Sequence, residues 1–107
     1  MSGGDRPVRV KVRFAPAAQA DLRAIRAFIA RDNPHRALSF VGELRQRCAS
    51  LTEFPERFPI AEGFEESSIR RLVHHSYLIF FRVEGTSVVI LRVLHGAQDY
   101  GTIIFPN

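Results

Sequence analysis

The segment from Ile69 to Tyr100 constrains the fold most, because it contains the pattern of three successive strands. Apolar runs at 72–73, 78–81 and 88–94 are rich in β-branched and aromatic residues, which favour strands. Gly85 lies between the second and third runs, and only a few residues separate the first two. Connections this short join antiparallel neighbours. The segment therefore predicts three antiparallel strands.

Basic side chains interrupt these apolar runs, namely Arg70, Arg71, His74, His75, Arg82, Arg92 and His95. A cation within a strand needs either solvent or an acidic partner. Internal pairing is sufficient for each arginine alone, for example Arg82 with Glu84 and Arg92 with Asp99. Taken together, the basic residues favour a shared acidic or nucleic-acid partner.

The hairpin at Gly85 leaves its register open. A three-residue loop would place Arg82 and Arg92 on one face of the sheet, whereas a two-residue loop would place them on opposite faces. Metal-independent RNA cleavage needs an acid, a base and cations that stabilise the charge on phosphorus. The three histidines of this segment could act as acid and base, and its arginines as the cations, only if the fold gathers them.

The residues before this segment predict one strand and two helices. Val8–Phe14 alternates apolar and basic residues, as in a strand at the edge of a sheet. A helix should begin at Pro16 and bury a stripe from Ala18 to Ile29. Asp32-Asn33-Pro34 should end it and begin a second helix. The stripe of that helix should contain Ala37, Val41, Leu44, Cys48 and Leu51, with Phe40 flanking it. A link this short predicts an antiparallel helical hairpin.

Residues 53–68 contain two prolines and three phenylalanines, so we expect a loop pinned over the core rather than a helix. The predicted order is β-α-α-β-β-β. The predicted fold class is α+β, in which the helical hairpin packs on one face of an antiparallel sheet in two layers. The second face would stay open unless the C-terminal segment covers it. An open apolar face dotted with arginine is a candidate site for a second chain.

With 107 residues, the chain has the length of one domain. Residues 1–7 are Gly-rich and polar, so we expect a flexible tail followed by a single domain at 8–107. The net charge of +4 favours an acidic or polyanionic partner, and it also serves solubility. Cys48 has no disulfide partner and no signal peptide or membrane-spanning run is present, so we expect a cytoplasmic protein. No metal or cofactor motif is visible.

Two segments together resemble a known family: FAPAAQADLRAIRAFIARDNPHRAL and RRLVHHSYLIFFRVEGTSVVILRVLHGAQDY. They are similar to the RelE/ParE superfamily of type II toxin-antitoxin toxins, and most of all to its ParE-like branch. The most telling pieces are Pro16–Leu22, the break at 32–34, and Val93–Gly96. The resemblance covers the chain from Val8 to Tyr100.

The resemblance implies a β-α-α-β-β-β toxin whose growth arrest is held off by an antitoxin. ParE-like members are taken to act on DNA gyrase without being nucleases, whereas RelE-like members cut mRNA on the ribosome. The RNA-cleaving branch tends to carry a basic residue where this chain has Tyr77, and it is often rich in lysine. Here no lysine follows Lys11, which favours the gyrase branch. His95 and Tyr100 keep the endonuclease alternative open.

We therefore expect a non-enzymatic gyrase inhibitor in complex with an acidic, amphipathic antitoxin that folds on binding. Residues that lie off the core stripes or carry unpaired charge should contact the antitoxin: Phe28, Phe40, Arg70, Tyr77, Arg82 and Arg92. Residues expected to contact the target are Arg71, His95 and Tyr100. In the alternative, a ribosome-dependent mRNA endonuclease would use Arg82, Arg92 and His95.

Overall fold

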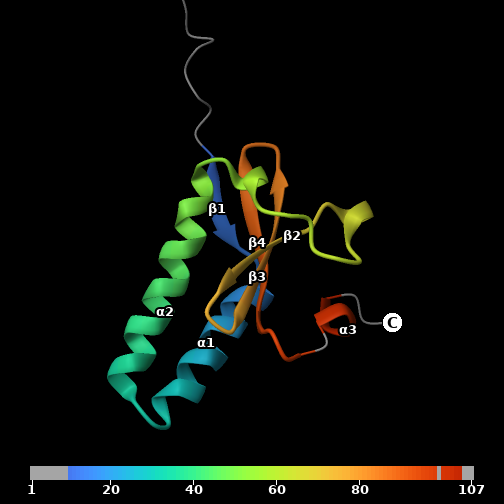
Figure 1. Ribbon diagram of the computed structural model, residues 1–107. Helices are drawn as coiled ribbons and strands as arrows, with labels where there is room; N and C mark the ends of the chain where they lie inside the picture. The colour runs from blue at the N-terminus through green and yellow to red at the C-terminus, as the bar shows by residue number, and fades with distance from the viewer. Residues whose placement is uncertain (1–9, 99, 105–107) are drawn as a thin grey trace, which may run out of the picture.

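The computed structural model describes residues 10–98 and 100–104 (Figure 1). Its elements are β1 (Lys11–Phe14), α1 (Pro16–Ala30), α2 (Pro34–Ala49), β2 (Arg70–His74), β3 (Tyr77–Glu84), β4 (Ser87–His95) and α3 (Tyr100–Ile104), with three short 3-10 turns between α2 and β2. The predicted order is confirmed, and a short C-terminal helix follows it. The tail predicted at residues 1–7 lies outside the described residues.

The sheet has the strand order β1-β4-β3-β2, with β1 at an edge as predicted. The β2–β3 and β3–β4 pairs are antiparallel, but β1 runs parallel to β4. The prediction of a wholly antiparallel sheet is therefore wrong for one strand pair. The two helices, the long loop and two further strands separate β1 from β4, so no short turn fixes their relative direction.

The helices α1 and α2 form a hairpin that covers one face of the sheet (Figure 1). Pro16 is the first residue of α1, and the Asn33 side chain caps α2 by accepting a hydrogen bond from the Arg36 N–H at 3.0 Å. The α1 stripe buries Ala18 and Leu22, as the sequence predicts. None of the described helices is long and apolar enough to cross a membrane.

The β3–β4 hairpin settles the register that the sequence left open. Val83 pairs with Val88, so the loop has two residues, and Gly85 adopts a φ of 60°. A bulge interrupts the pairing further along, because Phe81 pairs with Ile90 whereas Phe80 pairs with Arg92. One extra residue of β4 therefore shifts every later side chain of that strand to the opposite face.

Each face of the sheet has its own core. On the helix side, residues such as Leu44, Ile79 and Phe81 are buried together. Cys48 belongs to this core, and burial raises the pKa of its thiol to about 12, so the thiol stays neutral and acts as a packing group.

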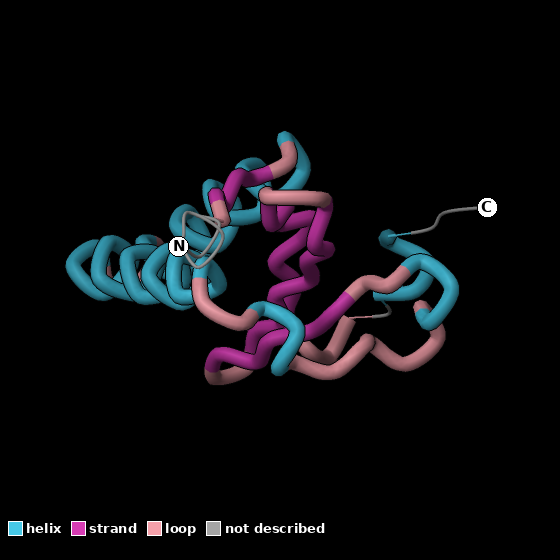
Figure 2. Tube along the Cα trace, turned by 90° about the horizontal axis from the view of Figure 1, so that it is seen from above, coloured by secondary structure: helices cyan, strands magenta, loops and turns pink. Residues whose placement is uncertain are grey.

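The second face is not open, which corrects the expectation from sequence. Ala61 and Phe64 of the long loop bury Phe80 and Leu94, and the side chains of Ile103 and Ile104 in α3 pack beside them. Figure 2 shows the long helices on one side of the strands, and the loop and α3 on the other. The prediction that the loop is pinned over the core is confirmed.

Candidate partner-binding surface

A hollow of about 370 Å³ lies between α1 and the end of β4. We call it the α1–β4 hollow; among the residues that line it are Asp21, Ile25, Phe28, Tyr77, Arg92 and His95. Four of these were singled out from the sequence as contact residues: Phe28, Tyr77, Arg92 and His95. The fold brings them together because β4 lies along α1, although Phe28 and Arg92 are far apart in the chain.

Among the large apolar residues of α1, Phe28 is the exposed one, with 62% of its surface open to solvent. It lies off the buried stripe, because at about 100° per residue it is turned well away from Leu22. Phenylalanine is enriched at protein interfaces, and an exposed apolar side chain that adjoins an apolar hollow is typical of a binding surface. The structure therefore confirms that Phe28 lies outside the core, where a partner can reach it.

Phe40 is different, and its assignment to the outer face of α2 is wrong. Only 6% of it is exposed, and it belongs to the core on the helix side. The buried stripe of α2 runs through Ala37, Phe40, Leu44 and Cys48, at spacings of three and four residues. The sequence pattern predicts Val41 on this stripe instead, and Val41 is only half-buried.

Arg92 is held by Asp21 of α1 through two hydrogen bonds. Its Nε and Nη2 donate to Oδ2 and Oδ1 of Asp21, each at 2.7 Å, and the Val93 N–H also donates to Oδ2 at 2.9 Å. The hydrogen bonds that the Asp21 carboxylate accepts from Arg92 raise the pKa of Arg92. Arg92 was expected to pair with Asp99, which lies outside the described residues.

Asp21 is thus a site residue that the sequence analysis missed. It stands in the quoted segment Pro16–Leu22, but nothing in the sequence links it to a residue of β4. Its side chain is only 11% exposed, so Asp21 contributes to the packing between α1 and β4 rather than to a solvated surface.

Two rings lie at the end of the sheet next to the hollow. The Tyr77 and His95 rings meet edge to face, with their centroids 5.3 Å apart. Burial raises the pKa of Tyr77, so its phenol stays protonated. Nδ1 of His95 accepts a hydrogen bond from the Ala97 N–H at 3.1 Å, which leaves the proton of the neutral ring on Nε2.

Another hollow, of about 450 Å³, lies beside α3 on the face of the sheet that α1 and α2 do not cover. Arg82 and Arg92 both line it, because the bulge in β4 returns Arg92 to the face of Arg82. Arg82 donates to Oε2 of Glu84 from Nε at 2.9 Å and Nη2 at 2.7 Å, which confirms that predicted pairing. His95 does not line this hollow.

Arg70 and Arg71 point to opposite faces, as expected for neighbours in a strand. The Arg70 guanidinium donates to the carbonyl oxygens of Phe58 at 2.6 Å and Glu56 at 3.1 Å, so it fastens the long loop to the sheet. Arg82 and Arg92 therefore have acidic partners, so the expectation of unpaired charge is wrong for these two. Arg70 is hydrogen-bonded to carbonyl oxygens only, and its side chain makes no ion pair among the described residues.

Arg71 and Tyr100 were predicted to contact the target. Arg71 is half-buried, and within the described part of the chain its side chain makes no ion pair. Tyr100 begins α3, and its side chain lies outside the described residues. His74 and His75, which were considered as acid and base, lie at the β2–β3 turn. In the sheet, β3, which begins at Tyr77, lies between β2 and β4.

Comparison with known proteins agrees with this architecture. A chain of the chromosomal ParDE TA system from P. aeruginosa is 22% identical, with a TM-score of 0.72, and the match covers 83% of this chain and 98% of that chain. A chain of the toxin-antitoxin complex RelBE2 from Mycobacterium tuberculosis is 24% identical, with a TM-score of 0.59 and coverage of 82% and 99%. These likenesses show a shared fold.

The family comparison is more specific. No curated protein sequence matches the chain. The family model described as the ParE toxin of the type II toxin-antitoxin system parDE matches residues 12–100, which include the two long helices α1 and α2 and the whole sheet apart from the first residue of β1. The chain therefore belongs to the ParE toxin family of type II toxin-antitoxin systems.

Proposed function

We propose that this toxin arrests growth in the cytoplasm by inhibiting DNA gyrase without catalysing a reaction, and that an antitoxin neutralises it by occupying the α1–β4 hollow. Membership of the ParE family supports this target over the ribosome. The observation that carries the antitoxin proposal is the exposed Phe28 beside an apolar hollow that ends at Arg92 and His95.

The chemistry of the hollow fits an acidic, amphipathic partner segment. Apolar side chains of such a segment would pack on Phe28 and Ile25, and a carboxylate could approach Arg92 or His95. The net charge of +4 would draw an acidic partner toward the chain. Both structural relatives come from toxin-antitoxin systems, which supports a hetero-oligomer with the antitoxin.

The state of the basic residues supports a non-enzymatic mode of action. RNA cleavage needs cations that are positioned where negative charge develops around the phosphorus in the transition state. Arg92 is held by both carboxylate oxygens of Asp21, and Arg82 by Glu84. Arg82 and His95 do not line a common hollow among those described. The three residues of the endonuclease alternative are therefore not gathered in one site.

A ribosome-dependent mRNA endonuclease remains the second candidate, because Arg92 and His95 do share the α1–β4 hollow. In that case His95 would act as the general acid or base, and Arg92 would leave Asp21 to meet the phosphate. The fold shared with the RelBE2 complex is compatible with this candidate.

Purified toxin tested against gyrase supercoiling and against translating mRNA separates the two candidates. We expect loss of supercoiling and intact mRNA. An endonuclease should lose about 100-fold or more of its mRNA cleavage in a His95→Ala variant, whereas a protein that acts by binding alone should lose no more than about tenfold in potency. His35→Ala, at an exposed position of α2, is the matched control. Cleaved mRNA with gyrase unaffected would refute the proposal.

A further inference from the structure

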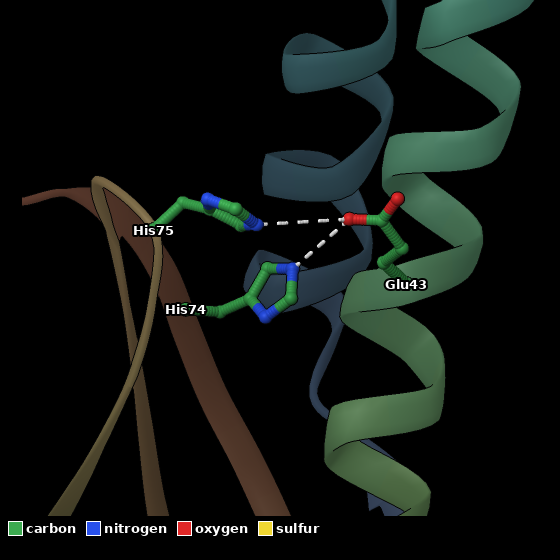
Figure 3. Close-up of side chains that lie close together, drawn as sticks. All are labelled: Glu43, His74 and His75. Atoms are coloured by element: carbon green, nitrogen blue, oxygen red, sulfur yellow. Dashed lines mark hydrogen bonds and ion pairs between the residues drawn. The ribbon is translucent and has the colours of Figure 1, made fainter.

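A second group of chemically active side chains lies where α2 passes the β2–β3 turn (Figure 3). Figure 3 shows His74 and His75 extending from the turn toward Glu43 of α2. Nε2 of His74 is 3.3 Å from Oε1 of Glu43, and Nε2 of His75 is 4.0 Å from the same oxygen. One ligand atom from each residue can be chosen so that all three lie within 4.8 Å of one another.

We propose that Glu43, His74 and His75 bind a divalent transition-metal cation of the Zn²⁺ type. Two imidazoles and one carboxylate are a donor set that suits zinc, and three protein ligands leave a fourth coordination position open to water. Zn–N and Zn–O distances near 2.0–2.2 Å place tetrahedral ligands about 3.4 Å apart. Small side-chain rotations would bring the three ligand atoms to that spacing.

The backbone explains why both imidazoles face the same way. Successive side chains in a strand point to opposite faces, and His74 is the last residue of β2. His75 adopts a φ of 54°, in the left-handed region that a residue with a Cβ rarely visits. This conformation ends the alternation, so the two rings meet edge to face with centroids 4.6 Å apart.

Arg36 engages one oxygen of Glu43 much more closely than the other. Its Nη1 donates to Oε2 at 2.6 Å, whereas its Nη2 reaches Oε1, the oxygen that both histidines approach, only at 3.5 Å. The hydrogen bond from Arg36 lowers the pKa of Glu43, which keeps the carboxylate ionised. An outer partner that orients a ligating carboxylate is typical of metal sites, and Arg36 is placed to act as one.

The two histidines differ in packing and in access to solvent. The His74 side chain is 14% exposed and lies against Phe40, with ring centroids 5.6 Å apart, so its position is fixed by packing. The His75 side chain is 62% exposed, which gives a cation a path from solvent. No sequence pattern indicates this site, because Glu43 is 31 residues from His74 and no spacing rule joins them.

Calorimetric titration of the tag-free chain of 107 residues with ZnCl₂ tests the proposal, with Co²⁺ absorption spectra as a second readout. We expect one Zn²⁺ per chain and a Co²⁺ spectrum typical of tetrahedral nitrogen and oxygen ligands. His75→Ala and Glu43→Gln should each weaken Zn²⁺ binding by about tenfold or more and abolish that spectrum. His35→Ala removes an exposed histidine outside the cluster and should bind Zn²⁺ as the wild type does.

Three results would overturn the metal site: no saturable Zn²⁺ binding, unchanged binding in both cluster variants, or an equal loss in His35→Ala. His75 is exposed and Glu43→Gln conserves shape, so both variants should fold, which circular dichroism checks. The measurement involves neither gyrase nor antitoxin, so its outcome is independent of the proposed function.

Discussion

Replacing Asp21 with alanine is expected to destabilise the toxin by about 3–5 kcal/mol, the usual cost of removing one partner from a buried ion pair. The Arg92 and Asp21 side chains are only 23% and 11% exposed, so the Arg92 guanidinium would stay in a partly desolvated place without its carboxylate. The Val93 N–H would lose its acceptor as well.

Urea unfolding of the wild type and variants measures this effect. Glu84→Ala is the matched control, because it removes a carboxylate from the exposed pair with Arg82, whose loss should cost about 0–1 kcal/mol. A double variant, Asp21→Ala with Arg92→Met, should regain much of the stability because no buried charge is left unpaired. A loss below about 1 kcal/mol in Asp21→Ala would show that this pair does not fasten α1 to β4.

Phe80→Ala should cost about 3–5 kcal/mol, as is typical when a large aromatic side chain is removed from a core. Phe80 is fully buried, and it lies on the second face of the sheet beneath the loop residues Ala61 and Phe64. The Phe64 and Phe80 rings are tilted, with centroids 6.4 Å apart. Loss of Phe80 should therefore free the loop as well as lower the free energy of unfolding.

Limited proteolysis between residues 53 and 68 reports on the loop, and urea unfolding reports on stability. Phe54→Ala is the control within the same loop, because Phe54 is 78% exposed and its removal should leave both readouts nearly unchanged. If Phe80→Ala left the loop as resistant to protease as the wild type, the second core would not be what holds it.

Much of the fold could be predicted because local patterns determine local structure. The stripe through Ala18 and Leu22, the cap at Asn33 and the apolar strand runs each act over a few residues. The direction of β1 relative to β4 depends on the path of the whole chain, so it could not be predicted. The second face of the sheet is covered by the loop and α3, and their positions depend on tertiary contacts that hydrophobic periodicity does not predict.

The site was predicted as separate residues but not as an arrangement. Phe28 could be identified because its position off the helical stripe is a local property. Phe40 could not, because the stripe of α2 can be drawn through either Phe40 or Val41, and the structure buries Phe40. The bulge that returns Arg92 to the face of Arg82 adds one unpaired residue to β4, and no sequence signal announces it.

The central claim is that partner recognition takes place at the α1–β4 hollow, and the affinity of a Phe28→Glu variant for the antitoxin tests it most directly. Phe54→Glu, which makes the same change at another exposed phenylalanine far along the chain, is the control. We predict that Phe28→Glu weakens antitoxin binding by about 30-fold or more, the equivalent of a hot spot worth about 2 kcal/mol, while Phe54→Glu binds within about threefold of the wild type. Wild-type affinity in a folded Phe28→Glu variant would contradict the claim.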